Sequence, residues 1–442
     1  MFAAQDDVRV QHELLADLSE ARAQTDKLFT VVKSDSLYER PIPERHRIVF
    51  YIGHLEAFDW NLVRGLIPHL HSFHPEFDRL FAFGIDPVDG GLPTDQPEDW
   101  PALAEIHRYR NRVREALDRV LEDPAFWRSS YDGFSAGTLV NVAMEHRLMH
   151  AETLAYMFHQ LPLEQKIRQG NMPAHTAHPL QFGMTEIPAG AATLGLSRDD
   201  SAFGWDNEFD AHLVSVPAFA IDRYKVTNGQ YLEFIDAGGY ENRSLWPEAG
   251  WTWKTEQDLS HPLFWKRRNG RWYYRTMFDE LPLPLDWPVF VSHTEASAYA
   301  RWAGKKLPTE AQWHRAAYGT AAGSERPYPW GAEPPARVHG YFDFRRWDPT
   351  PVNAFPRGAS AFGAAGLLGN GWEWTSSIFE PFEGFQQFSF YPGYSANFFD
   401  GKHYVLKGGS TRTAACMLRR SFRNWFQSHY PYVYAGFRCV SE

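Results

Sequence analysis

The 442-residue chain contains only two cysteines, Cys416 and Cys439. Two thiols are too few for a disulfide framework, and so few cysteines are typical of a protein from a reducing compartment. Long apolar runs are also missing: no stretch is long enough to span a bilayer, and the first residues are charged and amphipathic, unlike a signal peptide. We therefore expect a soluble, cytoplasmic protein with no membrane partner.

The chain also lacks an excess of basic residues. Its 44 lysines and arginines are outnumbered by 54 acidic residues, and the formal net charge is −10 at pH 7. Nucleic acids and anionic membranes attract basic surfaces, so we expect neither as a partner. A small-molecule substrate fits this charge better. Aromatic residues, by contrast, make up 16% of the chain, which is typical of aromatic-walled pockets or of a loop-rich fold packed by large side chains.

Length and periodicity divide the chain into two domains, because 442 residues exceed what one ordinary core holds. Apolar residues recur at helical spacing in four stretches near the start, which predicts a four-helix bundle over residues 1–165. We place a linker at residues 166–180 and a second, α+β domain with many loops at residues 181–442. In that domain we expect helices at two stretches only, residues 226–239 and 293–319.

Two histidines stand four residues apart in the fourth helical stretch, "VAMEHRLMHAET". Because residues i and i+4 share one face of a helix, His146 and His150 can point at one metal ion. The spacing alone favours two hydrogen-bonded core histidines instead. His54 adds a third candidate, since it lies between Phe50 and Phe58 on the inward stripe of the second helix. Three imidazoles from facing helices would leave positions on one ion for a substrate and O2.

A series of motifs in the second half of the chain carries a more specific signal. It runs over residues 187–440 and includes "IPAGAATLGL", "LPTEAQWHRAAYG", "GNGWEWTSS", "VLKGGS" and "AGFRCV". Together these motifs resemble the formylglycine-generating-enzyme-like fold, an α+β domain related to C-type lectins. Placed after a DinB-like bundle, the arrangement resembles the ergothioneine sulfoxide synthases, and "FGWDNE", "YPGYSANFFDG" and "FRNWF" resemble their close branch, the selenoneine synthases.

The resemblance implies an iron enzyme. Members of this family hold Fe(II) with three bundle histidines and use O2 to join a sulfur or selenium donor to the imidazole C2 of hercynine, the Nα-trimethylated betaine of histidine. The family's metal ligands fall on His54, His146 and His150. Its hercynine-binding pair falls on Asn424 and Trp425, where an amide can bind the carboxylate and an indole face can bind the quaternary ammonium.

The reacting groups that the resemblance implies are tyrosines rather than cysteines. The family's Tyr-x-x-Tyr falls on Tyr391 and Tyr394, which implies that Tyr391 delivers a proton, or a proton and an electron, to the oxygen, and that Tyr394 lies on the substrate side. Formylglycine-generating enzymes themselves carry a pair of cysteines shortly after "GGS", whereas this chain has one, Cys416. We expect Cys416 and Cys439 to be small buried hydrophobic residues.

Three positions depart from the family pattern. Members that use γ-glutamylcysteine carry an acid directly after the Asn-Trp pair and an arginine four residues later, where this chain has Phe426 and Tyr430. Because these aromatic residues remove the groups that grip a zwitterionic γ-glutamyl tail, we expect the donor to be free cysteine or a neutral selenosugar. Met149 replaces a glutamine that often precedes the second histidine of the pair and hydrogen-bonds hercynine.

Two other functions are compatible with these patterns. A DinB-like thiol transferase with a fused lectin-like domain would use zinc and would not need O2. A non-catalytic protein would bind a ligand through the lectin-like domain and keep the histidines as structural residues. The main hypothesis is an iron- and O2-dependent enzyme that forms a C–S or C–Se bond on hercynine.

Overall fold

A computed structural model describes residues 2–82, 92–170, 179–199 and 202–442, and these fall into two compact units. Unit 1 comprises the chain up to Gln169 together with a short segment from far along the sequence, Phe388–Pro392. Unit 2 comprises the remainder. Most of the predicted linker, at residues 171–178, lies outside the described residues. Each unit is therefore described by itself.

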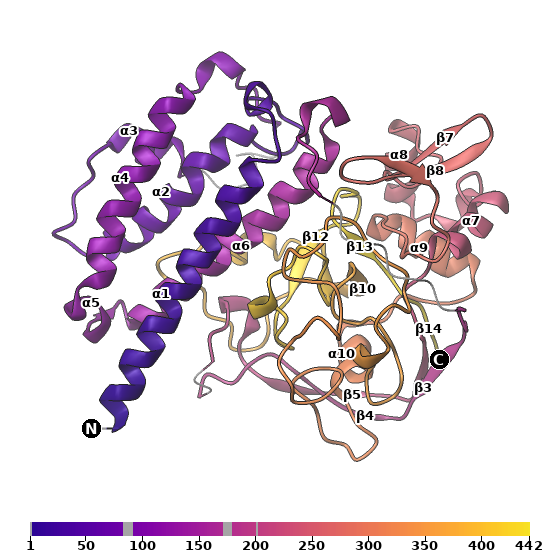
Figure 1. Ribbon diagram of the computed structural model, residues 1–442. Coiled ribbons are helices and arrows are strands. Elements are labelled where there is room, and N and C mark those ends of the chain that lie inside the picture. Colours follow the sequence, from indigo (N-terminus) through magenta and orange to yellow (C-terminus); the bar gives the residue numbers. More distant parts are fainter. Residues whose placement is uncertain (1, 83–91, 171–178, 200–201) are drawn as a thin grey trace. The chain divides into compact units, whose positions relative to one another are not determined.

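Unit 1 is a helical bundle. Its long helices, which run alongside one another in Figure 1, are α1 (Phe2–Phe29), α2 (Ile48–Leu66), α4 (Leu103–Glu122) and α6 (Ala136–Gln160). Helix α1 packs on α6, and α2 packs on both α4 and α6. Two short helices, α3 (Pro75–Leu80) and α5 (Pro124–Arg128), each begin with a proline, whose missing N–H costs nothing there. Within the described ranges, no helix combines the length and the apolar character that crossing a membrane requires.

Helical periodicity predicts these elements because one face of each helix is buried. In α4 the buried residues are Ile106, Tyr109, Val113, Leu117 and Leu121, at the three- and four-residue spacing of a single stripe. The four-helix prediction is confirmed.

A small hairpin, absent from the sequence prediction, precedes α6. Strands β1 (Ser130–Tyr131) and β2 (Phe134–Ser135) pair antiparallel. The turn residues Asp132 and Gly133 both have positive φ, as a type I′ turn requires and an Asp-Gly sequence favours. The hydroxyl of Ser135 then accepts a hydrogen bond from the amide of Thr138 at 3.1 Å and caps α6. The hairpin is thus continuous with the helix that carries His146 and His150.

Unit 2 is the expected α+β domain. Its sheets have the strand orders β12-β11-β10-β13, β14-β6-β3, β4-β5 and β7-β8-β9. The strands are β3 (Met184–Ile187), β4 (Gly190–Leu194), β5 (His212–Val216), β6 (Phe219–Asp222), β7 (Trp265–Arg268), β8 (Arg271–Arg275), β9 (Glu280–Pro282), β10 (Trp372–Ile378), β11 (His403–Lys407), β12 (Asn424–Gln427), β13 (Ala435–Gly436) and β14 (Val440–Ser441). A core of buried apolar residues forms where α10 (Glu310–Tyr318) packs on β4 and β5.

Both stretches predicted to be helical in this domain contain helices, but the prediction that there are only two is wrong. The first is α7 (Asn228–Asp236), but the second contains two helices, α9 (His293–Trp302) and α10, separated at Gly304 with φ +67° and at Pro308. Helix α8 (Glu248–Glu256) was not predicted, because its glycine and its Trp and Thr residues are weak helix formers. A Cβ on Gly250 would come 2.3 Å from the Thr294 side chain, so the glycine permits close packing against α9.

Candidate metal centre

Three histidines converge in the interior of unit 1. His54 on α2 and His146 and His150 on α6 are each no more than 3% exposed. The Nε2 atom of His150 lies 3.2 Å from that of His54 and 3.1 Å from that of His146. One ring nitrogen from each histidine lies within 4.8 Å of the others. No other group of three or more His, Cys, Asp or Glu residues in the described part of the chain is so arranged.

The separations fit a shared metal ion. Two imidazole nitrogens bound at about 2.1 Å to one ion, at about a right angle, stand about 3.0 Å apart. The Nδ1 atom of His54 lies 2.7 Å from the carbonyl oxygen of Phe81. Because a carbonyl oxygen accepts but never donates, Nδ1 carries the proton and Nε2 keeps a lone pair for a metal.

Burial keeps the three rings neutral. Desolvation lowers the pKa of His54 to about 4, and the nearby positive charge of Arg147 adds to the effect. The pKa values of His146 and His150 lie well below the usual value for the same reason, reinforced by the neighbouring histidines. Since the neutral imidazole is the form that coordinates metals, the cluster can accept a cation at neutral pH without first losing protons.

A buried ion network lies beside the cluster. Arg147, which sits between His146 and His150 on α6, is fully buried. Its guanidinium donates to both carboxylate oxygens of Glu56 at 3.0 Å and to Asp59 at 2.6 Å. It also donates to the backbone carbonyl of Leu55, the residue after His54. These bonds connect the two ligand-bearing helices directly beside the ligands, so they set the register in which the imidazoles meet.

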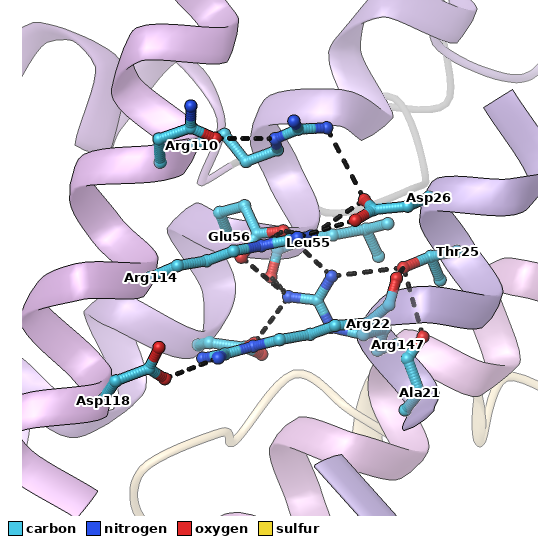
Figure 2. A network of polar contacts seen from close by, with 12 residues as sticks. Ala21, Arg22, Thr25, Asp26, Leu55, Glu56, Arg110, Arg114, Asp118 and Arg147 are labelled. Atoms are coloured by element: carbon cyan, nitrogen blue, oxygen red, sulfur yellow. Dashed lines mark hydrogen bonds and ion pairs between the residues drawn. The ribbon is translucent and has the colours of Figure 1, made fainter. Parts of the chain in front are cut away.

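The network extends to the other two long helices, as Figure 2 shows. Arg114 on α4 donates to Glu56 at 2.6 Å and, through both terminal nitrogens, to Asp26 on α1. Burial alone would raise the pKa of Glu56, but the guanidinium groups of Arg147 and Arg114 lower it to about 2. Sequence reasoning missed these residues. The available signal was the pair of carboxylates, Glu56 and Asp59, inside the otherwise apolar stretch "YIGHLEAFDWNLV".

Aromatic rings enclose the histidines. Phe50 stacks on His54 with ring centroids 4.7 Å apart, and Phe58 stacks on His146 at 3.4 Å. The ring of Tyr51 lies 5.5 Å from that of His150. Such apolar walls limit the water near the cluster and hold the imidazole planes in place.

Tyr391 lies beside this cluster although it is far along the chain. Its ring centroid is 6.2 Å from that of His146 and 5.1 Å from that of Phe58. This contact is internal to unit 1, which includes Phe388–Pro392. Of the two tyrosines in "YPGY", the structure brings Tyr391 to the histidines, whereas Tyr394 belongs to unit 2. Met149 is half-buried on α6, next to His150.

The remaining predicted residues lie in unit 2, on or near β12. The indole of Trp425 stacks on Phe379 at 4.2 Å, and the ring of Tyr394 meets it edge-on at 5.4 Å. Tyr394 in turn stacks on Trp205 at 3.9 Å. The side-chain oxygen of Asn424 accepts a hydrogen bond from the backbone amide of Trp425 at 2.9 Å. The structure therefore groups Trp205, Phe379, Tyr394 and Trp425 in one aromatic cluster.

Phe426 and Tyr430, which follow the Asn-Trp pair, also lie together. The rings of Phe426 and Tyr430 are nearly parallel, with centroids 5.2 Å apart and planes 6° apart. Tyr432 meets Tyr430 edge-on at 5.0 Å. The two positions from which we predict the donor are thus neighbours in space.

The two cysteines differ in their exposure to solvent. Cys439 is buried, as expected, but Cys416 is exposed, so the expectation that it is buried is wrong. Cys416 sits in a short 3-10 turn, Ala415–Met417, in which the buried residue is Met417. A turn of this kind points successive side chains in different directions, which an apolar composition does not reveal.

Comparisons with known proteins match both halves of the chain. Residues 17–154 match the DinB superfamily, and residues 170–442 match the Sulfatase-modifying factor enzyme 1-like domain. A hercynine oxygenase from Mycolicibacterium thermoresistibile is 38% identical over 462 residues, which cover 98% of this chain and 95% of that protein. The chain belongs to the hercynine oxygenase family. The predicted family, fold class and non-heme iron enzyme class are thereby confirmed.

Two other members of the hercynine oxygenase family show how far the similarity extends. The protein from Mycolicibacterium smegmatis is 34% identical, over 97% of this chain and 99% of its own length. The protein from Mycobacterium tuberculosis is 45% identical over 248 residues, so the match spans 55% of this chain and 57% of that protein. The similarity identifies the family and leaves the identity of the donor as a prediction.

Proposed function

We propose that the protein is an Fe(II)- and O2-dependent enzyme that joins a sulfur or selenium donor to the imidazole C2 of hercynine. The observation that carries this proposal is the buried three-histidine cluster in a chain similar over nearly its full length to hercynine oxygenases. His54, His146 and His150 would hold the iron. Bound there, iron supplies the redox chemistry that lets O2 react, with positions left for substrates.

The overall reaction balances with one O2. A C–H bond of hercynine and an S–H or Se–H bond of the donor are replaced by one C–S or C–Se bond, which releases two electrons and two protons. Oxygenation of the sulfur or selenium releases two more electrons. One oxygen atom ends on the sulfur or selenium, and the other leaves as water with the two protons.

The protein's own side chains take defined parts in this reaction. Tyr391, whose ring lies 6.2 Å from that of His146, delivers a proton to the reacting oxygen. Asn424 and Trp425 bind hercynine through its carboxylate and its quaternary ammonium. Tyr394, packed between Trp205 and Trp425, lines the substrate side.

The donor that we propose is a neutral selenosugar, with free cysteine as the second candidate. The parallel Phe426–Tyr430 stack supports this choice, because an aromatic surface suits the C–H face of a sugar. Cysteine carries two charges on its small backbone, and each needs a partner when it leaves water. The soft thioether of Met149, next to His150, is compatible with a selenium donor.

A donor panel tests the proposal. The protein is purified without oxygen, loaded with Fe(II), and given hercynine, O2 and one of three donors: 1-seleno-β-D-glucose, cysteine or γ-glutamylcysteine. Mass spectrometry is expected to detect a C2-substituted product with the selenosugar. His146→Ala, with its fold checked by circular dichroism, should lower product formation by at least about a thousand-fold, or about 4 kcal/mol.

The other outcomes are equally informative. If no donor gives a C2-substituted product, the proposed reaction is wrong. If the zinc-loaded protein transfers a thiol without O2, the protein is a thiol transferase. Product formation with cysteine alone would leave the reaction standing and replace the selenosugar as the donor.

A further inference from the structure

We propose that the β1–β2 hairpin holds the segment Phe388–Pro392 and thereby places Tyr391 beside the histidines, with Phe134 and Ser389 as positioning residues. This inference rests on the proposed function, in which Tyr391 delivers a proton. The hairpin lies outside the histidine cluster, and neither Phe134 nor Ser389 touches a histidine of that cluster in the described contacts.

Phe134 is the apolar part of this anchor. Its ring meets that of Phe388 edge-on at 5.3 Å and that of Phe390 edge-on at 4.9 Å. The rings of Phe388 and Phe390 stack on each other at 5.0 Å. One hairpin side chain therefore holds two residues of the segment, and edge-to-face pairs of this kind add to the free energy gained from burial.

Ser389 supplies the polar part. Its hydroxyl donates a hydrogen bond to the carboxylate of Asp132, the first residue of the hairpin turn. Three successive residues of the segment, Phe388 to Phe390, thus contact one Asp-Gly-Phe sequence. The positive φ of Asp132 and Gly133 shapes the turn so that the carboxylate and the Phe134 ring are presented together.

A tight turn then carries the segment to the cluster. The amide of Tyr391 donates to the carbonyl oxygen of Phe388 at 3.1 Å, which closes a turn over residues 388–391. At its far end the Tyr391 ring packs edge-on against Phe58 at 5.1 Å, and Phe58 stacks on His146. The segment is therefore held at one end by the hairpin and at the other by the aromatic wall of the histidine cluster.

The anchor is rigidly connected to the histidines. The hydroxyl of Tyr131 donates to the carbonyl of Phe126 at 3.0 Å, which fixes the hairpin to α5. Ser135 is both the end of β2 and the cap of α6. His146 follows on that same helix, with a rise of about 1.5 Å per residue. Because anchor and histidine share one continuous element, their separation changes only if α6 or the hairpin unfolds.

Such an anchor matters because a loop tyrosine pays an entropic cost to be in place. Fixing the backbone of a loop residue removes conformational entropy, and proton transfer requires the phenol within hydrogen-bond reach. Contacts made before substrate binds remove part of that cost from the catalytic step. Loosening the anchor should therefore lower kcat without changing substrate affinity.

The test uses the full-length protein and two measurements. In Phe134→Ala, amide hydrogen exchange of residues 388–391 should rise by about tenfold or more. With iron bound, kcat should fall about tenfold, while KM for hercynine and the affinity for Fe(II) change by less than about twofold. Ser389→Ala should raise exchange of the segment and lower kcat in the same way, each by about threefold. The matched control is Phe385→Ala, whose half-buried ring lies on the same loop but pairs with Phe399 at 5.1 Å; it should leave both readouts unchanged.

A double variant decides whether Phe134 acts through Tyr391. If it does, Phe134→Ala lowers kcat no further in a Tyr391→Phe background. Additive losses, unchanged exchange in Phe134→Ala, or faster exchange throughout α6 would each overturn the proposal. Wild-type rates in Tyr391→Phe would instead overturn the role of Tyr391 in the proposed function, and the exchange data would still decide whether the hairpin holds the segment.

Discussion

The histidine cluster of unit 1 and the aromatic stack at the end of β12 in unit 2 are built in different ways. Each histidine of the cluster projects from a long helix, and a buried ion network joins the same helices. Phe426 lies on a four-residue strand, and Tyr430 lies in the turn that follows it. The position of the metal centre therefore depends on the register of long helices, whereas that of the stack depends on a short strand and the turn after it.

The largest expected effect comes from breaking the helix register. Replacing Arg147 by Met leaves the buried carboxylates of Glu56 and Asp59 without their main partner, so we expect a loss of about 3–5 kcal/mol in the free energy of unfolding. Urea denaturation measures this loss of unfolding free energy. Affinity for Fe(II) should fall about 10- to 100-fold, because α2 and α6, which carry the ligands, lose the ion pairs that hold them together.

Arg110→Met is the matched control for that variant. Arg110 belongs to the same network but is 23% exposed and pairs with Asp26 at 3.5 Å, so its loss should cost less than about 1 kcal/mol. Equal losses of unfolding free energy in both variants would show that the buried ion pairs of Arg147 have no special role.

The next effect follows from the neutral histidines. In the metal-free protein, the pKa of His54 is lowered to about 4, whereas in the unfolded chain it is about 6.5. Between these values the unfolded state binds more protons, so stability falls as the pH drops below about 6.5. Full titration of His54 corresponds to about 3 kcal/mol.

The measurement is urea denaturation of the metal-free protein at a series of pH values from 7.5 to 5. In His54→Gln the dependence on pH should be weaker by up to about 1.4 kcal/mol per pH unit, because this side chain no longer takes up a proton on unfolding. Identical slopes in the two proteins would contradict the inference that His54 is buried in its neutral form.

Helical period explains which parts of this molecule could be predicted from the sequence. The fourth predicted helical stretch lies within α6, and His54, His146 and His150 meet because each lies on an inward stripe. Strict apolar spacing over many residues is a redundant signal, and a helix of that length is insensitive to an error of one residue. The motifs of unit 2 identified its fold for a similar reason, since many weak matches in one order reinforce each other.

Pairings between distant segments could not be predicted in this way. Periodicity shows that Arg147 is inside α6 but not that Glu56 and Asp59 face it, because partner choice across helices leaves no local pattern. The same holds for Phe134 and the segment that carries Tyr391. The hairpin of β1 and β2 was missed because two-residue strands are too short to show alternation, although its Asp-Gly turn is a recognised signal.

The smallest expected effect is a change of donor. Replacing Phe426 by Asp and Tyr430 by Arg introduces the pair of charges that the family resemblance implies for members that use γ-glutamylcysteine, at positions whose rings now lie 5.2 Å apart. We expect turnover with γ-glutamylcysteine to rise about tenfold, which corresponds to about 1.4 kcal/mol, and turnover with 1-seleno-β-D-glucose to fall by a similar factor. Competition between the two donors, followed by mass spectrometry, measures both. Tyr432→Phe, which keeps the ring beside Tyr430, should leave the ratio unchanged. An unchanged ratio of turnover with the two donors in the double variant would mean that other residues select the donor. The difference in construction between the metal centre and the stack would then have no bearing on donor choice.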